Sequence, residues 1–499
     1  MNSAFAIQPV ARDASAERRQ VNSFDVFDTL IARRCIEPER IFDSVERRLG
    51  VPGFARHRRQ AESALSGNDT NLDAIHAELA RRMGLGQSES NRLKAAEIAA
   101  ELDNAIPIAA NMAKVRDGDL LISDMYLSEG VIRAMLAKAG LDRECGLVVS
   151  ADGKSSGWIW PALQMSLRIA CHVGDNPHAD VASPARYGIA AAQTTRAAPD
   201  LIETWMIDQG VRDIAEIIRE TRLACDDGDH VTNRLRWVQT HLNFPLLLLA
   251  SVRLARQANR IGCSHVLFSS RDCNLWLPLY NLIAQRMGAP PGRYFYTNRQ
   301  TRVRPSADYL AYAEQALGAT GMVADLCGSG WSLAHLLRHL GQTGRDVFLL
   351  HHMPELPRYE TIGPAPETCR IHAILPPSTQ GVRNDVLEMC NYASHGTVLD
   401  VTRVGKAALP ILATDAYPEA LAERVQAQRA TFAGVVARLA SRPAASFGDL
   451  DDGAIDAIVL SLYRVISAEP MLPEVFGAAH NANDAAVMQA LETKQVVLF

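Results

Sequence analysis

Four short segments in the first 180 residues hold side chains of types and spacing that could do chemistry. They are FDVFDTL with Asp25, LISD with Ser123, SADGKSSG with Lys154, and VGDN with Asp175, followed by Asp180. An aspartate can attack an electrophilic centre and form a covalent intermediate. Carboxylate oxygens are also the ligands that Mg²⁺ prefers. The set therefore indicates a metal-assisted reaction in which a carboxylate is the nucleophile.

Each of these segments follows a short apolar run that reads as a β-strand. The expected strands lie in VNSFDVFDTLI, DGDLLISDM, ECGLVVSAD, ACHVGDN and IAAAQTT, with helical patterns between them. This alternation predicts parallel βαβ units in a three-layer α/β fold. Ligands of an open parallel sheet bind beyond the carboxyl ends of its strands, and all four segments fall there. Residues 35–114 read as a helical insert, a cap, after the first strand.

In their order and strand-end positions, the four segments resemble the motif series of the haloacid dehalogenase superfamily. The resemblance implies that Asp25 is the nucleophile, that Ser123 binds a phosphoryl oxygen, and that Lys154 holds the anion and the nucleophile. It also implies an Mg²⁺ cofactor. The ligands expected for that ion are Asp25, the backbone carbonyl of Phe27, Asp175 and Asp180, with Asn176 as an alternative to Asp180.

Phe27 departs from the phosphatase pattern of that superfamily. Phosphatases usually carry a second aspartate two positions after the nucleophile, as general acid and base, whereas Asp28 stands one residue further on. An aromatic residue here resembles the dehalogenase branch. It leaves open dehalogenase-like chemistry, phosphotransfer assisted by another group, a slow phosphatase, or a site that only binds. Other groups that could supply a proton, although a structural role explains each more simply, are Asp124, His172 and His178.

The second half of the chain carries a further series of polar groups after expected strands. Ser270, Asn298 and Arg299 belong to it. A phosphate- or substrate-binding site is predicted at Arg271, Asp272, Asp325, Gly328, Ser329 and Gly330. The glycine-rich loop loosely resembles the phosphoribosyl diphosphate loop of phosphoribosyltransferases, but it lacks their paired acidic residues. A tight turn explains the glycines equally well.

The whole organisation resembles a family of large two-part predicted hydrolases. Its softer second-half motifs match PLL at 245–247, FSSRD at 268–272 and DLCGS at 325–329, although Cys273 stands where that family usually has glycine. Such proteins tend to be encoded beside glycosyltransferases of surface-polysaccharide synthesis, which implies a sugar phosphate or nucleotide sugar as substrate. The domains predicted are a mobile arm at 1–19, a Rossmann-like catalytic domain at 20–205, a second Rossmann-like α/β domain at 206–365, and a mixed, largely helical region at 366–499.

Composition narrows the function classes. The 499 residues carry a net charge of −5, with 48% hydrophobic residues, so no basic surface for nucleic acid is expected. Nine cysteines without metal-ligand spacing predict reduced thiols in the cytoplasm. The N-terminus lacks the apolar stretch of a signal peptide. The longest apolar run, FPLLLLASV, is too short to span a bilayer and predicts a buried helix.

Three functions are consistent with these patterns. The first is a Mg²⁺-dependent phosphohydrolase or phosphotransferase that acts on a small phosphorylated metabolite such as a sugar phosphate. The second is a glycosyl- or phosphoribosyl-type transferase whose main site lies in the second α/β domain. The third is a scaffold without catalysis, or a dehalogenase-like hydrolase, for which Phe27 is the main argument.

Overall fold

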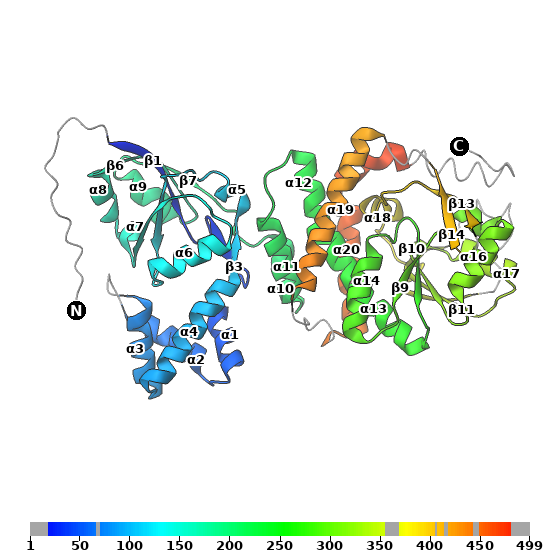
Figure 1. Cartoon of the computed structure of the whole chain (residues 1–499), viewed down its shortest axis with the longest axis horizontal. Coiled ribbons are helices and arrows are strands. Elements are labelled where there is room, and N and C mark those ends of the chain that lie inside the picture. The colour runs from blue at the N-terminus through cyan, green and yellow to red at the C-terminus, as the bar shows by residue number, and fades with distance from the viewer. Residues whose placement is uncertain are drawn as a thin grey trace. The chain divides into compact units, whose positions relative to one another are not determined.

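The computed structural model of the chain forms two compact units (Figure 1). It describes residues 18–65, 70–354, 369–404, 407–413, 418–442 and 449–480. The first unit runs to Pro199 and includes Leu223–Asp226, and the second holds Asp200–Arg222 and the described residues from Asp227 on. Most of the predicted arm lies outside the described residues, and the first strand already begins at Arg19. The region 366–499, which the sequence analysis set apart, groups with the second unit.

The first unit is built on a five-stranded sheet in the order β5-β4-β1-β6-β7, and all neighbours are parallel. Its strands are β1 (Arg19–Asp25), β4 (Leu120–Asp124), β5 (Gly146–Ser150), β6 (Leu167–Gly174) and β7 (Ala190–Gln193). The α/β class with a parallel sheet is thereby confirmed. The strand β6 begins earlier than the expected ACHVGDN run.

Alternating side chains bury both faces of this sheet. Leu121 packs with Ile132 of one flanking helix, whereas Leu120 and Ile122 pack with Trp160 of another. Successive residues of a strand point to opposite faces, so one apolar run serves two helical layers. The helices of these layers and of the connections are α5 (Ala109–Met112), α6 (Glu129–Lys138), α7 (Gly153–Ser156), α8 (Ile159–Gln164), the π-helix η1 (Pro177–Ala182) and α9 (Ser183–Ala185).

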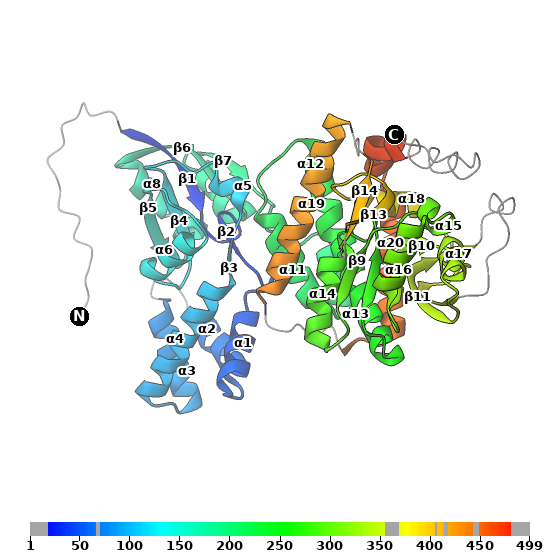
Figure 2. The ribbon, with the colours of Figure 1, turned by 45° about the vertical axis from the view of Figure 1, so that its right-hand side comes forward.

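Four helices between β1 and β4 form a bundle with a core of its own. They are α1 (Arg40–Leu49), α2 (Phe54–Ser63), α3 (Leu72–Met83) and α4 (Gln87–Asn104). Figures 1 and 2 show them together, apart from the sheet. The chain enters and leaves the bundle through a short antiparallel pair that the sequence analysis missed, β2 (Ile31–Arg33) and β3 (Ala105–Pro107). Inside the bundle, Arg58 is fully buried and donates to Glu97 at 2.7 Å.

The second unit also contains a five-stranded parallel sheet, in the order β12-β11-β10-β8-β9. Its strands are β8 (Val266–Ser269), β9 (Gly292–Phe295), β10 (Met322–Gly328), β11 (Arg345–His352) and β12 (Cys369–Leu375). β12 comes from the region expected to be largely helical. That region adds a hairpin too, of β13 (Val398–Val404) and β14 (Ala407–Leu412). The sequence predicts a mixed, mostly helical C-terminal region, and these three strands are its β part. That β12 completes the second sheet is decided by the tertiary fold.

Helices cover both faces of the second sheet, as in the first. α13 (Phe244–Ile261) contains the FPLLLL run, and its residues from Phe244 to Val252 are all buried, as predicted. Among the described helices, none combines the length and apolar composition that a bilayer crossing requires. The remaining helices are α10 (Leu201–Asp208), α11 (Arg212–Leu223), α12 (His230–Trp237), η2 (Val238–Asn243), α14 (Trp276–Met287), α15 (Arg299–Val303), α16 (Ala307–Leu317), α17 (Trp331–His339), α18 (Asn384–Cys390), α19 (Glu419–Ala440) and α20 (Asp452–Ser467).

The strand orders place a crevice at one point of each sheet. In the first, the chain goes from β1 outward to β4 and β5, and then returns to add β6 on the other side of β1. In the second, β9 lies on one side of β8 and β10 on the other. Connections leave such a switch point in opposite directions, so a crevice opens beyond the carboxyl ends of the two strands.

Candidate functional site

Asp25 ends the central strand of the first sheet, at the switch point between β1 and β6. The chain then turns sharply: Leu30 N donates to Val26 O at 2.9 Å, and Asp28 takes a left-handed conformation with φ of 55°. Aspartate tolerates that conformation better than most residues. The turn holds the Asp25 carboxylate at the sheet edge, where the residue is only 5% exposed.

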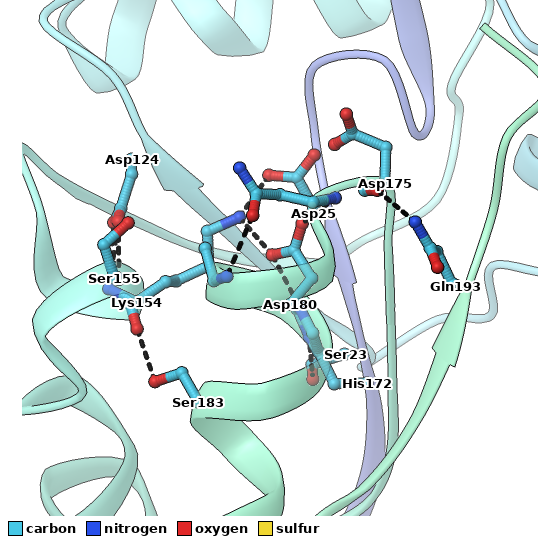
Figure 3. A network of polar contacts seen from close by, with 12 residues as sticks. Ser23, Asp25, Asp124, Lys154, Ser155, His172, Asp175, Asp180, Ser183 and Gln193 are labelled. Atoms are coloured by element: carbon cyan, nitrogen blue, oxygen red, sulfur yellow. Dashed lines mark hydrogen bonds and ion pairs between the residues drawn. The ribbon is translucent and has the colours of Figure 1, made fainter. Parts of the chain in front are cut away.

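Lys154 meets Asp25 from the segment after β5 (Figure 3). Its ammonium group contacts Asp25 Oδ1 and donates to Asp180 Oδ1 at 2.7 Å, with the residue 3% exposed. The Asp124 carboxylate accepts hydrogen bonds from the backbone N–H groups of Lys154 and Ser155, at 3.0 and 3.1 Å. Asp124 therefore positions the lysine, in agreement with the structural interpretation of that residue.

Asp180 is the most enclosed carboxylate of the group. His172 Nε2 donates to its Oδ1 at 3.1 Å, and the Ser23 hydroxyl lies 2.8 Å from the other ring nitrogen of His172. A Cβ on Gly174 would come within 2.2 Å of Asp180 Cγ. Glycine is thus required for the close approach of Asp180 to the end of β6. His172 is fully buried in this role, which makes it structural too.

Asp175 completes a cluster with the candidate ligand atoms of Asp25 and Asp180, all within 4.8 Å of one another. Three carboxylates from two strand-end segments, Asp25 of β1 and Asp175 and Asp180 after β6, fit a hard divalent cation that takes oxygen ligands. Asn176, the alternative ligand, is engaged elsewhere: its Oδ1 accepts from His178 N and Ala179 N at 2.9 and 3.0 Å and caps η1.

The electrostatics of the cluster follow from burial and crowding. Burial raises the pKa of Asp25, and Lys154 partly offsets this. Burial, followed by the charges of Asp25 and Asp28, raises the pKa of Asp175 to about 7. Burial acts in the same direction on Asp180, but His172 and Lys154 outweigh it and lower its pKa to about 2. The site thus concentrates more negative charge than Lys154 alone neutralises.

Ser123 and Phe27 differ in what they offer to a ligand. Ser123 is buried at the end of β4, next to β1, and its hydroxyl has no hydrogen-bond partner among the described residues. The half-buried Phe27 ring lies 4.7 Å from the guanidinium carbon of Arg33, which forms a buried pair with Glu101 of α4 at 2.8 Å. Phe27 therefore anchors the base of the helical bundle and supplies no proton.

In the second unit, all six residues predicted for a further site line one cavity of about 220 Å³. It lies at the carboxyl ends of β8 and β10. Arg271 and Asp272 follow β8, and Asp325 to Gly330 span the end of β10 and the loop before α17. Two further residues, which no pattern in the sequence singled out, also line the cavity: Arg302 and Glu388 of α18. Arg302 follows Arg299 by three residues on α15, a spacing that could have indicated one shared helix face.

No protein-family model matches the chain, and no curated protein matches it. The fold and the two sites therefore define an α/β protein with two parallel sheets, each with charged side chains at its switch point.

Proposed function

We propose that the first unit is a haloacid-dehalogenase-type phosphohydrolase or phosphotransferase that acts on a small phosphorylated metabolite such as a sugar phosphate. The observation that supports this most is the convergence of Asp25, Asp175 and Asp180 within 4.8 Å at the carboxyl edge of the sheet. Lys154 contacts the first and third of these carboxylates.

Asp25 is the nucleophile in this proposal. One of its carboxylate oxygens attacks phosphorus, the bond from phosphorus to the leaving oxygen breaks, and the leaving group departs with that electron pair. A water molecule, or an acceptor hydroxyl, then attacks the phosphoryl group and restores the Asp25 carboxylate. Mg²⁺ held by Asp25, Asp175 and Asp180 would offset the charge of the phosphoryl group. Lys154 holds the nucleophile in place, and Ser123 offers its unpartnered hydroxyl to a phosphoryl oxygen.

The four-helix bundle acts as the cap in this proposal. It joins the sheet through β2 and β3, immediately after the turn that carries Phe27. The stacking of Phe27 on Arg33 and the ion pair of Arg33 with Glu101 connect that turn to α4. We propose that residues of the bundle select the substrate that binds at Asp25.

Phe27 sets the expected leaving-group preference. A leaving group of low pKa needs no proton, whereas an alkoxide needs a general acid. Because Phe27 cannot donate one, we expect aryl phosphates and acyl phosphates to react faster than alkyl phosphates. This preference separates the proposal from an ordinary phosphatase.

Turnover of p-nitrophenyl phosphate by the full-length protein with Mg²⁺ tests the proposal, since this substrate needs no general acid. We expect Asp25→Asn to lower kcat by about a thousandfold or more. The matched control is Asp142→Asn, the same change at an exposed aspartate of the same unit. Full activity in Asp25→Asn, or no turnover across a panel of phosphate esters, would refute the proposal. Halide release from a 2-haloacid, assayed in parallel, would favour the dehalogenase alternative instead.

A further inference from the structure

The strand order of the second sheet places its cavity where ligands usually bind in parallel α/β sheets. It lies beyond the carboxyl ends of β8 and β10, the two strands between which the order of the sheet reverses. Its volume of about 220 Å³ is below the roughly 300–1,000 Å³ of pockets for drug-sized ligands. The volume therefore favours a small occupant.

One wall of the cavity is held rigid by Arg302. This residue is 7% exposed, and its guanidinium donates to Ser269 Oγ at 2.7 Å, to Thr297 Oγ1 at 2.9 Å and to Asp325 Oδ2 at 3.1 Å. The contact with Asp325 pairs the two charges. Asp325 is thus a positioning residue that fixes the wall.

Groups suited to an anion gather beside this wall. Arg271 and Arg299 line the cavity, and so does the loop Gly328–Gly330, which leads into α17. Guanidinium groups and backbone N–H groups at a helix start are the usual phosphate ligands in proteins. A Cβ added at Gly328 would meet only Gly330 N, at 3.8 Å, so the loop leaves open space where an anion could approach its backbone.

Two carboxyl groups face the same cavity without a strong partner. Within the part of the chain that the structure describes, the Asp272 side chain has no hydrogen-bond or ion-pair partner. Glu388 has only long contacts, with Asn384 Nδ2 at 3.4 Å and His480 Nε2 at 3.6 Å. Burial raises the pKa of Asp272 to about 6, and burial together with Asp272 raises that of Glu388 to about 8. Both side chains are half-buried, and hydroxyl groups of a ligand in the cavity could donate to both.

We propose that this cavity binds a small phosphorylated polyol, such as a sugar monophosphate. The phosphate lies against Arg271, Arg299 and the Gly328–Gly330 loop, and the hydroxyl groups donate to Asp272 and Glu388. A metal ion fits less well. Among the described residues, the carboxylate oxygens of Asp272, Asp325 and Glu388 do not form a cluster in which all possible ligand atoms lie within 4.8 Å of one another. This site is independent of the chemistry proposed for Asp25.

Isothermal titration of the full-length Asp25→Asn protein in EDTA tests the proposal without turnover at the first unit. The probes are glucose 1-phosphate, glucose and inorganic phosphate. We expect glucose 1-phosphate to bind at least about tenfold more tightly than either of the others. Adding Gly328→Leu, which fills the space beside the loop, or Arg299→Ala should weaken its binding by about tenfold or more. The matched control is Arg338→Ala, at an exposed arginine of α17.

The outcomes separate the two units. Loss of binding with Gly328→Leu and Arg299→Ala, but not with Lys154→Met, supports the second-unit site. If only Lys154→Met abolished the binding of glucose 1-phosphate, the probe would bind in the first unit, and the proposal would be overturned. Equal affinity for inorganic phosphate would refute the polyol part, and no binding by any probe would refute the ligand class. Melting temperatures show whether each variant is folded, and Arg299→Ala keeps the test decisive if Gly328→Leu does not fold.

Discussion

The two parallel sheets place charged residues at equivalent points but arrange the charges differently. In the first unit, three carboxylates converge within 4.8 Å of one another, and Lys154 is the cation that contacts two of them. In the second, Asp325 is paired with Arg302, and Asp272 and Glu388 share their cavity with Arg271 and Arg299. Strand order decides where a ligand binds, whereas side-chain charge decides which ligand it is.

The difference has a simple physical consequence. Crowded carboxylates repel one another, so binding of a cation among them stabilises the first site. The second site places Arg271 and Arg299 in the same cavity as Asp272 and Glu388, so it suits an anion that also carries hydroxyl groups. The predictions below test this contrast.

The largest effect is expected from Lys154→Met. Removing the ammonium group leaves Asp25 and Asp180 buried without their shared cation. We expect the free energy of unfolding to fall by about 3–5 kcal/mol, measured by urea denaturation. Lys138→Met, at an exposed lysine whose side chain is 46% accessible, is the control. A loss no larger than that of the control would show that the folded protein does not depend on the pairing of Asp25 and Asp180 with Lys154.

A smaller effect is expected from Mg²⁺. At about 100 times its dissociation constant, the ion should stabilise the first unit by roughly 2.7 kcal/mol, seen as a rise in melting temperature. Asp175→Asn should abolish the rise, because it removes one of the three clustered carboxylates. Asp142→Asn should not. A rise that persists in Asp175→Asn would contradict the contrast between the two sites.

Arg302→Met should lower the free energy of unfolding by about 2 kcal/mol. It removes the guanidinium that donates to Ser269, Thr297 and Asp325. The loss is limited because Tyr309 Oη still donates to Thr297 Oγ1 and Leu326 N still donates to Asp325 Oδ1. Arg338→Met on the exposed side of α17 serves as the control. If Arg302→Met lowered the free energy of unfolding as much as Lys154→Met, each site would depend equally on its own buried cation, and the contrast would fail.

The last effect is a pH dependence at Glu388, whose pKa is raised to about 8 by burial and by Asp272. Between the unfolded pKa of about 4.5 and the folded value, the folded protein holds the extra proton. Its contribution to stability therefore falls as pH rises across this range. Relative to the wild type, Glu388→Gln should be more stable at pH 8 than at pH 5, and the exposed Glu314→Gln should show no such trend. Urea denaturation at the two pH values measures this, and an equal difference at both would show that Glu388 titrates normally.

Much of the first site could be predicted from the sequence, because its residues lie at the ends of apolar runs or a few residues after them. Asp25, Lys154 and Asp175 stand at strand ends or just after them, and parallel strands bring their carboxyl ends to one edge of the sheet. The same argument located Arg271 and Asp325 in the second unit. The α/β class follows from the alternation of strand and helix patterns.

Other features depend on contacts between distant segments, which no local pattern records. The capping roles of Asp124 and Asn176 became visible only with the segments that they bind. Arg302 meets Asp325 across 23 residues of sequence.

The sequence by itself determined the types of chemistry available: carboxylates and a lysine in the first half, arginines and a glycine loop in the second. The tertiary structure decided which of these groups are neutralised and which are left for a ligand. Asp25 is paired with Lys154, Asp325 with Arg302, and the Asp272 carboxyl has no such partner among the described residues. The physical reason is that burial and pairing depend on distances in space, and those are set when β12, the helical bundle and the strand crossovers pack together.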